Sequence, residues 1–314
     1  MQELEKNILK TLVWFDVFSF PLVAGEVLFY LMNVNFLDKN FTDEQKGIMN
    51  YELRTKKSLD ELVNKKKIEQ KDEFYFLTGR EEIVEIRKQR KEISLKKIKK
   101  VKKLVKFLKF VPWIKAIFLC NSVGYLNAKE NSDIDLFIIT KPNRIWSARW
   151  WSVGWLKLFN LRPNAKNKKD KFCLSYFVTE DNLNLEQTKI SEFDVSLIYW
   201  LTSFQPLYFE NDLWNKFVKT NEWVKKYLPN CELCESRVLG SANNTNILKN
   251  NFSLQEKILK KIQLWYLPKE LKNASQENNN KVIINDKMLK FHLSDKRQED
   301  FEKWDKNLKK KLNY

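Results

Sequence analysis

The hydrophobic positions of the chain change their spacing along its length. In the first third they recur every three or four residues, as on one face of a helix. This spacing predicts four helices, over residues 3–17, 23–32, 58–66 and 87–109. Ser58, with Glu61 three residues later, predicts an N-cap for the third of them. A short hairpin is expected before the fourth, where Ile68 and the apolar run 74–77 flank a charged turn.

The middle of the chain has a different pattern, made of nearly continuous apolar runs. Runs at 116–120, 134–140 and 172–178 are short and rich in β-branched and aromatic residues, which is typical of buried strands. Between the last two, residues 144–159 have helical spacing and several tryptophans. We expect this helix to cover the sheet, so that its aromatic stripe is core packing.

Helical spacing returns beyond residue 193, over 194–202, 213–227 and 254–266. A chain of 314 residues is long enough for two or three domains. We predict an α+β fold, with a small mixed β-sheet core flanked by helices. The expected units are an N-terminal domain (1–85), a basic linker helix (86–110), the sheet-containing core (111–192) and a mostly helical C-terminal domain (193–314).

Two acidic side chains stand at the start of the second apolar run of the core. Residues two apart in a strand project from the same face, so Asp133 and Asp135 are expected side by side. Such carboxylates repel each other unless a cation lies between them, and oxygen ligands of this kind suit Mg²⁺. Ser122 follows the preceding strand, at a turn into a helix where backbone N–H groups can hold an anion. A metal site beside a phosphate site predicts chemistry on a nucleotide.

Segment 116–140 resembles the signature of the nucleotidyltransferase superfamily of DNA polymerase beta. Ser122 matches the serine of the family's Gly-Ser pair, and Asn121 replaces its glycine. Asp133 and Asp135 match the family's metal-binding Asp-x-Asp pair. The resemblance implies that both aspartates are catalytic and bind Mg²⁺. It also implies that an NTP contacts the nearby polar residues Asn121, Ser122, Ser132 and Ser175. The alternative is a chance Asp-x-Asp after a serine that only caps a helix.

Active members of that family usually carry a third acidic residue on a later strand. Here the strand at 172–178 contains no acid, and Ser175 stands near the expected position. Asp170, Glu180 and Asp181 flank this strand, and they either supply the missing carboxylate or are ordinary turn residues. A two-metal mechanism requires the third ligand, whereas two carboxylates can hold one Mg²⁺ brought by a nucleotide.

Helices followed by a β-hairpin over residues 1–82 resemble a winged helix-turn-helix domain. In that family the helix before the wing often enters a DNA groove. The resemblance therefore implies phosphate contacts from lysines at the ends of this helix: Lys56, Lys57, Lys65 and Lys66. Many winged helices instead dock proteins, so both kinds of partner stay open.

The chain is strongly basic, with 57 Lys and Arg against 40 Asp and Glu and a net charge of +17. Segment 87–109 concentrates this charge, with twelve basic residues and a single acid. Such an excess favours a polyanionic partner such as RNA or DNA. The alternative is a solvated helix face over a hydrophobic seam, in a lysine-rich composition. The residues of this segment expected to contact nucleic acid are Lys96, Lys97, Lys99 and Lys100.

The cysteines predict a reducing compartment, and the hydropathy of the chain predicts that it does not span a membrane. Cys120 and Cys173 fall in apolar strands as core thiols, and Cys231-x-x-Cys234 lacks the second ligand pair of a zinc site. The sequence opens without a secretory signal, and no apolar run is long enough to span a bilayer. We therefore expect a cytoplasmic protein without a membrane partner.

Together these features predict a Mg²⁺-dependent nucleotidyltransferase that transfers NMP from an NTP to an RNA end, a protein or a small molecule. The competing hypothesis is a nucleic-acid-binding regulator whose nucleotidyltransferase core is degenerate. A third hypothesis is one half of a toxin–antidote module. The only histidine, His292, is expected to be structural, with a role as general base as the alternative.

Overall fold

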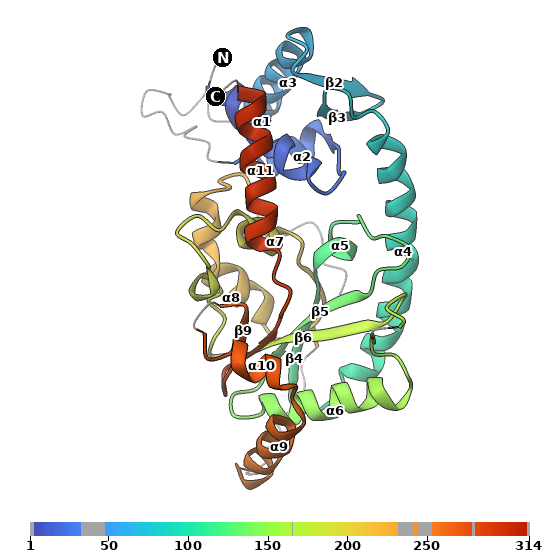
Figure 1. The fold of residues 1–314 in the computed structure, drawn as a ribbon, viewed down its shortest axis with the longest axis vertical. Helices are drawn as coiled ribbons and strands as arrows, with labels where there is room; N and C mark the ends of the chain where they lie inside the picture. The colour runs from blue at the N-terminus through green and yellow to red at the C-terminus, as the bar shows by residue number, and fades with distance from the viewer. Residues whose placement is uncertain are drawn as a thin grey trace.

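The computed structural model describes residues 3–32, 48–164, 166–231, 242–243, 253–277 and 280–312. It confirms a mixed α+β fold, with eleven α-helices and two β-sheets in the described part of the chain. Figure 1 shows a smaller N-terminal unit and a larger sheet-containing body, with helix α4 (Ile83–Leu108) running along both. Within the described ranges, no helix is long and apolar enough to cross a membrane.

The N-terminal unit surrounds a small antiparallel sheet in which β3 lies between β1 and β2. Its elements are α1 (Glu3–Asp16), β1 (Leu22–Val23), α2 (Ala24–Phe29), α3 (Ile48–Asn64), β2 (Ile68–Lys71) and β3 (Phe74–Leu77). The first predicted helix and the hairpin are confirmed. The predicted helix start at Ser58 is wrong, because α3 begins at Ile48 and buries Ser58 in its interior. The capping pattern at this serine therefore lies inside a continuous helix.

The larger sheet forms the centre of the molecule. Its strands lie in the order β8 (Ala242–Asn243), β7 (Gln205–Glu210), β4 (Ile114–Leu119), β5 (Ile134–Thr140), β6 (Phe172–Thr179), β10 (Met288–Phe291) and β9 (Val282–Ile284). The pairs β5–β6 and β7–β8 are parallel and the others are antiparallel, so the sheet is mixed, as predicted. Successive residues of one strand, such as Phe118 and Leu119, belong to different hydrophobic clusters. The sheet is therefore buried on both faces.

The chain beyond residue 193 differs from the predicted helical region. It supplies β7, β8, β9 and β10 to the two edges of the large sheet. Three of these strands hold only two to four residues, so alternation within them carries little signal. The helical elements of this region are α7 (Val195–Thr202), α8 (Leu213–Thr220), the 3-10 helix η3 (Glu222–Lys226), α9 (Ser253–Tyr266), α10 (Lys269–Ala274) and α11 (Arg297–Leu312).

Two long helices connect the N-terminal unit to the sheet. Helix α4 follows the hairpin, and its residues Ile98 and Val101 are buried in the same hydrophobic cluster as one face of the sheet. Helix α11 packs against α1, where the Trp304 indole N–H donates to the Lys10 carbonyl at 3.0 Å. Figure 1 shows α11 running from the sheet towards the N-terminal helices. The N-terminal unit is therefore held at two points.

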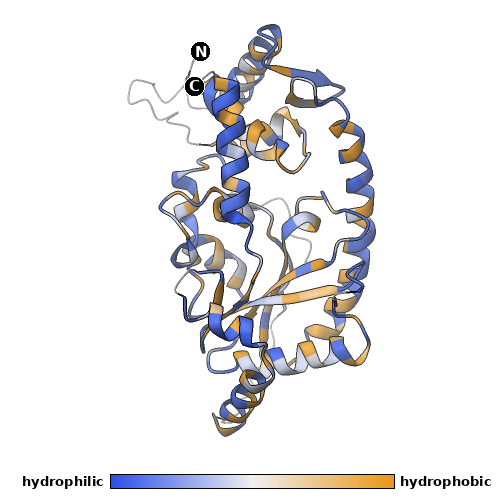
Figure 2. Cartoon of the chain, viewed as in Figure 1, coloured by the Kyte–Doolittle hydropathy of each residue, from blue (hydrophilic) through white to orange (hydrophobic). Residues whose placement is uncertain are grey.

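Helix α6 (Ile145–Leu158) packs on the large sheet, as predicted, but its aromatic stripe is only partly core. Trp146 is fully buried, whereas three further tryptophans are 38–50% exposed: Trp150, Trp151 and Trp155. Helix α9 packs on α6, and its buried Glu256 carboxylate accepts hydrogen bonds from two N–H groups in the first turn of α6, at 2.7 and 3.0 Å. Figure 2 shows hydrophobic colours along β5 and β6 and largely hydrophilic colours along α11.

Candidate functional site

The chain turns sharply where β4 ends, at the short helix α5 (Asn121–Gly124). Asn121 has a φ of 59°, in the left-handed region that glycine and asparagine adopt most easily. Its backbone N–H donates to Ser203 Oγ at 3.0 Å. A Cβ on Gly124 would lie 2.1 Å from the Ser203 carbonyl oxygen, so a larger residue would displace the turn. Asparagine at position 121 thus provides the backbone that a glycine would, and the turn is fixed against the end of α7.

Asp133 and Asp135 lie together at the start of β5, as predicted. Asp135 pairs in parallel register with Cys173 of β6. One ligand atom from each of these three residues lies within 4.8 Å of the other two. We call Asp133, Asp135 and Cys173 the carboxylate cluster. Its two carboxylates are close enough to share one cation.

The carboxylate cluster concentrates negative charge in a half-buried place. The pKa of the Asp135 carboxyl is raised to about 6, mainly by burial and next by the charge of Asp133. Hydrogen bonds with the Asn121 and Cys173 side chains oppose this rise. The pKa of the Cys173 thiol is raised to about 12, again mainly by burial and next by the charge of Asp135. Burial and the neighbouring carboxylate therefore disfavour the ionised form of Asp135, and a bound cation would favour it.

The donor atoms of the cluster fit a hard divalent cation. Two carboxylates are common protein ligands of Mg²⁺, which completes its shell with water and substrate phosphates. A thiol suits zinc and other soft metals, and it binds them as the thiolate. Mg²⁺ prefers oxygen ligands, so the soft sulfur of Cys173 is a poor third ligand for it. The cluster therefore suits a single Mg²⁺ between Asp133 and Asp135.

Cys173 lies beside the two aspartates, which sequence reasoning missed, and the Ser175 side chain forms a hydrogen bond with Cys173. Ser175 Oγ lies 2.9 Å from Nε2 of His292, the residue that follows β10. The pKa of His292 is lowered to about 4, mainly by burial, so its imidazole is neutral at pH 7. Strand alternation in 172–178 places Cys173 and Ser175 on one face. The pairing register that selects Cys173 is set by the neighbouring strand, so a single sequence does not reveal it.

The carboxylates of the acidic residues that flank β6 do not join the cluster. Glu180 and Asp181 follow the opposite end of the strand from Cys173, and Asp181 pairs with Lys287. Asp170 precedes the strand, but its carboxylate binds two lysines of α4: Lys97 at 2.9 Å and Lys100 at 2.5 Å. None of these three acids takes the place of the family's third carboxylate.

The lysines that were predicted to contact nucleic acid differ in exposure. Lys97 is buried, and its ammonium donates to the Ser132 carbonyl at 2.8 Å, so it orders the turn before Asp133. Ser132 itself donates its hydroxyl to the Lys129 carbonyl at 2.9 Å. Lys65 is half-exposed and pairs with Glu5. The remaining predicted lysines are exposed on or beside α3 and α4: Lys56, Lys57, Lys66, Lys96, Lys99 and Lys100.

A cavity of about 730 Å³ adjoins the carboxylate cluster. Its volume lies in the range typical of small-molecule sites. Cys173 belongs both to the cluster and to the cavity wall, which also contains three predicted nucleotide contacts: Asn121, Ser122 and Ser175. An aromatic part of the wall consists of Trp14, Phe18, Tyr176 and Trp200. Trp14 and Phe18 come from the N-terminal unit. Their contribution to the wall was not predicted, because it depends on how that unit packs on the sheet.

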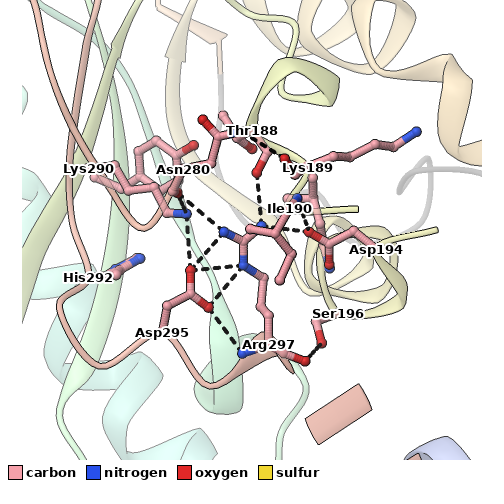
Figure 3. A network of polar contacts seen from close by, with 12 residues as sticks. Thr188, Lys189, Ile190, Asp194, Ser196, Asn280, Lys290, His292, Asp295 and Arg297 are labelled. Carbon is pink, nitrogen blue, oxygen red and sulfur yellow. Dashed lines mark hydrogen bonds and ion pairs between the residues drawn. The ribbon is translucent and has the colours of Figure 1, made fainter. Parts of the chain in front are cut away.

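Another part of the cavity wall is a network of paired charges. Arg297, the first residue of α11, binds Asp194 and Asp295, each at 2.7 Å. Lys290 lies 3.4 Å from Asp295 and donates to the Asn280 carbonyl at 2.6 Å. We call these five residues the Arg297 network, and Figure 3 shows them converging around the guanidinium. Opposite charges alternate throughout it, so it joins α7, β10 and α11 without a ligand.

Comparison with known proteins adds no relative. No protein-family model, curated protein or solved structure matches the chain significantly. The functional conclusion therefore depends on the residues of this chain and on their chemistry.

Proposed function

We propose that the protein is a Mg²⁺-dependent nucleotidyltransferase. The observation that carries the proposal is the adjacent pair Asp133 and Asp135. The pair lies beside Cys173, which lines a cavity whose wall also contains the left-handed turn at Asn121. Two neighbouring carboxylates in a half-buried place are unfavourable without a cation. A magnesium-bound triphosphate would supply that cation, and its phosphates could accept hydrogen bonds from the N–H groups of the turn.

In the proposed reaction, a hydroxyl oxygen of the acceptor attacks the α-phosphorus of the NTP, and the proton of this hydroxyl passes to solvent water. The bond from this phosphorus to the oxygen that bridges the β-phosphorus breaks, and pyrophosphate leaves. Asp133 and Asp135 would hold Mg²⁺, which neutralises the charge of the phosphates. Ser122, through its hydroxyl and its backbone N–H, would hold the terminal phosphates. The aromatic part of the cavity wall would hold the base by stacking.

Transfer of label from α-phosphate-labelled NTPs tests this proposal. The full chain is incubated with Mg²⁺, each NTP, and RNA, protein or small-molecule extracts. Asp133→Asn and Asp135→Asn should each reduce transfer about 10²-fold or more, because the phosphate charge loses its metal. Asp181→Asn is the matched control, since it removes a more exposed carboxylate at the far end of β6. Transfer that survives in both site variants would contradict the proposal.

We also infer that the N-terminal unit is a winged-helix domain. The order helix, strand, two helices and hairpin supports this inference, as does the three-stranded antiparallel sheet. Its exposed lysines would then contact the phosphates of RNA or DNA. Binding to a labelled duplex should weaken steeply with salt in the wild type and less steeply in the double variant Lys56→Gln, Lys57→Gln. An unchanged salt dependence would favour a protein partner for this unit.

One observation favours a second function. Cys173 occupies the place beside the aspartates where an active two-metal site needs a carboxylate. A core without that ligand could bind a nucleotide without transferring it, in a regulator that acts through nucleic acid. Salt-sensitive binding to a duplex, with nucleotide binding but no label transfer to any acceptor, would support the regulator over the enzyme.

A further inference from the structure

A buried arginine of α6 has no acidic partner. Arg149 is only 8% exposed, and one of its N–H groups donates to the Gln263 amide oxygen at 2.6 Å. Its Nε has no hydrogen-bond partner, and no ion pair joins it to any residue in the described part of the chain. The guanidinium lies over the Phe291 ring, with its central carbon 4.6 Å from the ring centre. Because a charge withdrawn from water is costly without a counter-ion, this arrangement favours an anion nearby.

Arg162 brings a second positive charge to the same region. It lines the cavity together with Cys173 and Phe291. Among the described residues, Arg162 has no hydrogen-bond or ion-pair partner. Burial lowers the pKa of Arg162, and the pKa of Arg149 is lowered to about 10 by burial and next by the charge of Arg162. The two guanidiniums therefore repel each other across a half-buried wall.

We propose that Arg162, in the cavity wall with Cys173, and Arg149, whose guanidinium lies over Phe291 of the same wall, form a phosphate-binding subsite. A guanidinium presents several N–H donors in a planar fork that matches phosphate oxygens. Arg162 supplies such donors at the cavity wall. Arg149 has an unpaired Nε, and its guanidinium lies over Phe291, which lines the same cavity. One bound phosphate would also offset the repulsion between the two arginines.

The phosphate can come from two sources, the triphosphate of a nucleotide or a phosphate group on the acceptor. The subsite itself goes beyond the proposed transferase and does not depend on it. The choice between these two sources does rest on the proposed function. Because Cys173 belongs to both the cavity wall and the carboxylate cluster, either phosphate would lie near the proposed metal.

Calorimetric titration of the full chain with inorganic tripolyphosphate, in EDTA, tests the subsite. Arg162→Gln should weaken binding about tenfold or more, because hydrogen bonds to a charged group are lost. Lys168→Gln is the matched control: it removes one positive charge from the same loop at an exposed position. Arg149→Lys keeps the charge but loses the fork, and it should also weaken binding. Thermal unfolding of each variant verifies that it is folded. Equal affinity in the wild type and Arg162→Gln would overturn the proposal.

A second titration distinguishes the two sources. Inorganic phosphate is added to protein saturated with Mg²⁺ and an α,β-methylene NTP. Phosphate binding that persists, and that Arg162→Gln abolishes, assigns the subsite to the acceptor. Loss of phosphate binding, together with weaker NTP binding by Arg162→Gln, assigns it to the nucleotide. If tripolyphosphate binds through Arg162 but no NTP donates label, only the transferase proposal fails. If label is transferred and Arg162→Gln changes no affinity, only the subsite fails.

Discussion

Two regions that each contribute residues to the cavity wall differ in how their charges are balanced. In the Arg297 network, the guanidinium of Arg297 lies between Asp194 and Asp295, and each contact is 2.7 Å. In the region around Cys173, like charges lie together instead. Asp133 stands beside Asp135, and a second such pair consists of Arg149 and Arg162. One region is complete within the protein, whereas the other has charges that only a ligand can balance.

This difference separates a structural role from a binding role. Groups that satisfy one another in the folded chain contribute to folding, and they offer little to a ligand. Groups held together against their own repulsion lower the stability of the unliganded protein, and a ligand of the right charge recovers that free energy. The Arg297 network is therefore expected to control stability, and the carboxylate cluster is expected to control binding.

The largest effect is expected for Arg297→Gln. This change leaves Asp194 and Asp295 buried without their shared counter-ion, so the free energy of unfolding should fall by about 3–5 kcal/mol. Urea unfolding followed by circular dichroism measures the change. Lys303→Gln is the matched control on the same helix, because it breaks an exposed pair with Glu299 and should leave the unfolding midpoint unchanged. Equal midpoints for wild type and Arg297→Gln would remove the distinction between the two regions.

Local pattern was enough to predict much of the fold. The first helix, the hairpin at 68–77, the long basic helix and the strand at 172–179 have strong periodicity, and each lies where the sequence predicted it. The strands β9 and β10 hold three and four residues, and long-range pairing determines where they lie. They were missed because a run of that length has no reliable period.

The candidate site shows the same division between local and tertiary information. Asp133 and Asp135 could be paired from the sequence because residues two apart in a strand share a face. The position of Cys173 beside them could not be predicted from the sequence, since it depends on the register between β5 and β6. Arg162 carries no sequence signal, and the burial of Arg149 could not be predicted from its helix. They matter because no acidic side chain pairs with them in the described part of the chain. Which side chains become neighbours is decided by the tertiary structure.

A second way to sharpen the comparison is to make the same substitution in both regions. The pKa of Asp135 is raised from 3.8 to about 6, so its ionisation costs more in the folded state than in the unfolded state. Relative to Asp135→Asn, the wild type should therefore lose stability as pH rises from 4 to 6. In EDTA at neutral pH, Asp135→Asn should therefore raise the free energy of unfolding by about 3 kcal/mol. Asp295→Asn, the matched change in the Arg297 network, should lower it. Chemical unfolding of both variants measures the two signs, and destabilisation by Asp135→Asn would contradict the proposed imbalance.

The smallest expected effect is the pH dependence of the Arg297 network. The pKa of Asp295 is lowered from 3.8 to about 2 by its hydrogen bond with Arg297 and by the positive charges of Arg297 and Lys290, against the opposing effect of burial. A carboxyl with a lowered folded-state pKa stabilises the protein above pH 4, and this contribution disappears as pH falls towards 2. Between pH 5 and pH 3, the wild type should thus lose about 1 kcal/mol more stability than Asp295→Asn. Urea unfolding of the two proteins across this range measures the difference. Parallel curves would mean that Asp295 has the same pKa in the folded and unfolded states. The Arg297 network would then be no better balanced than the carboxylate cluster, and the distinction between a structural and a binding region would not hold.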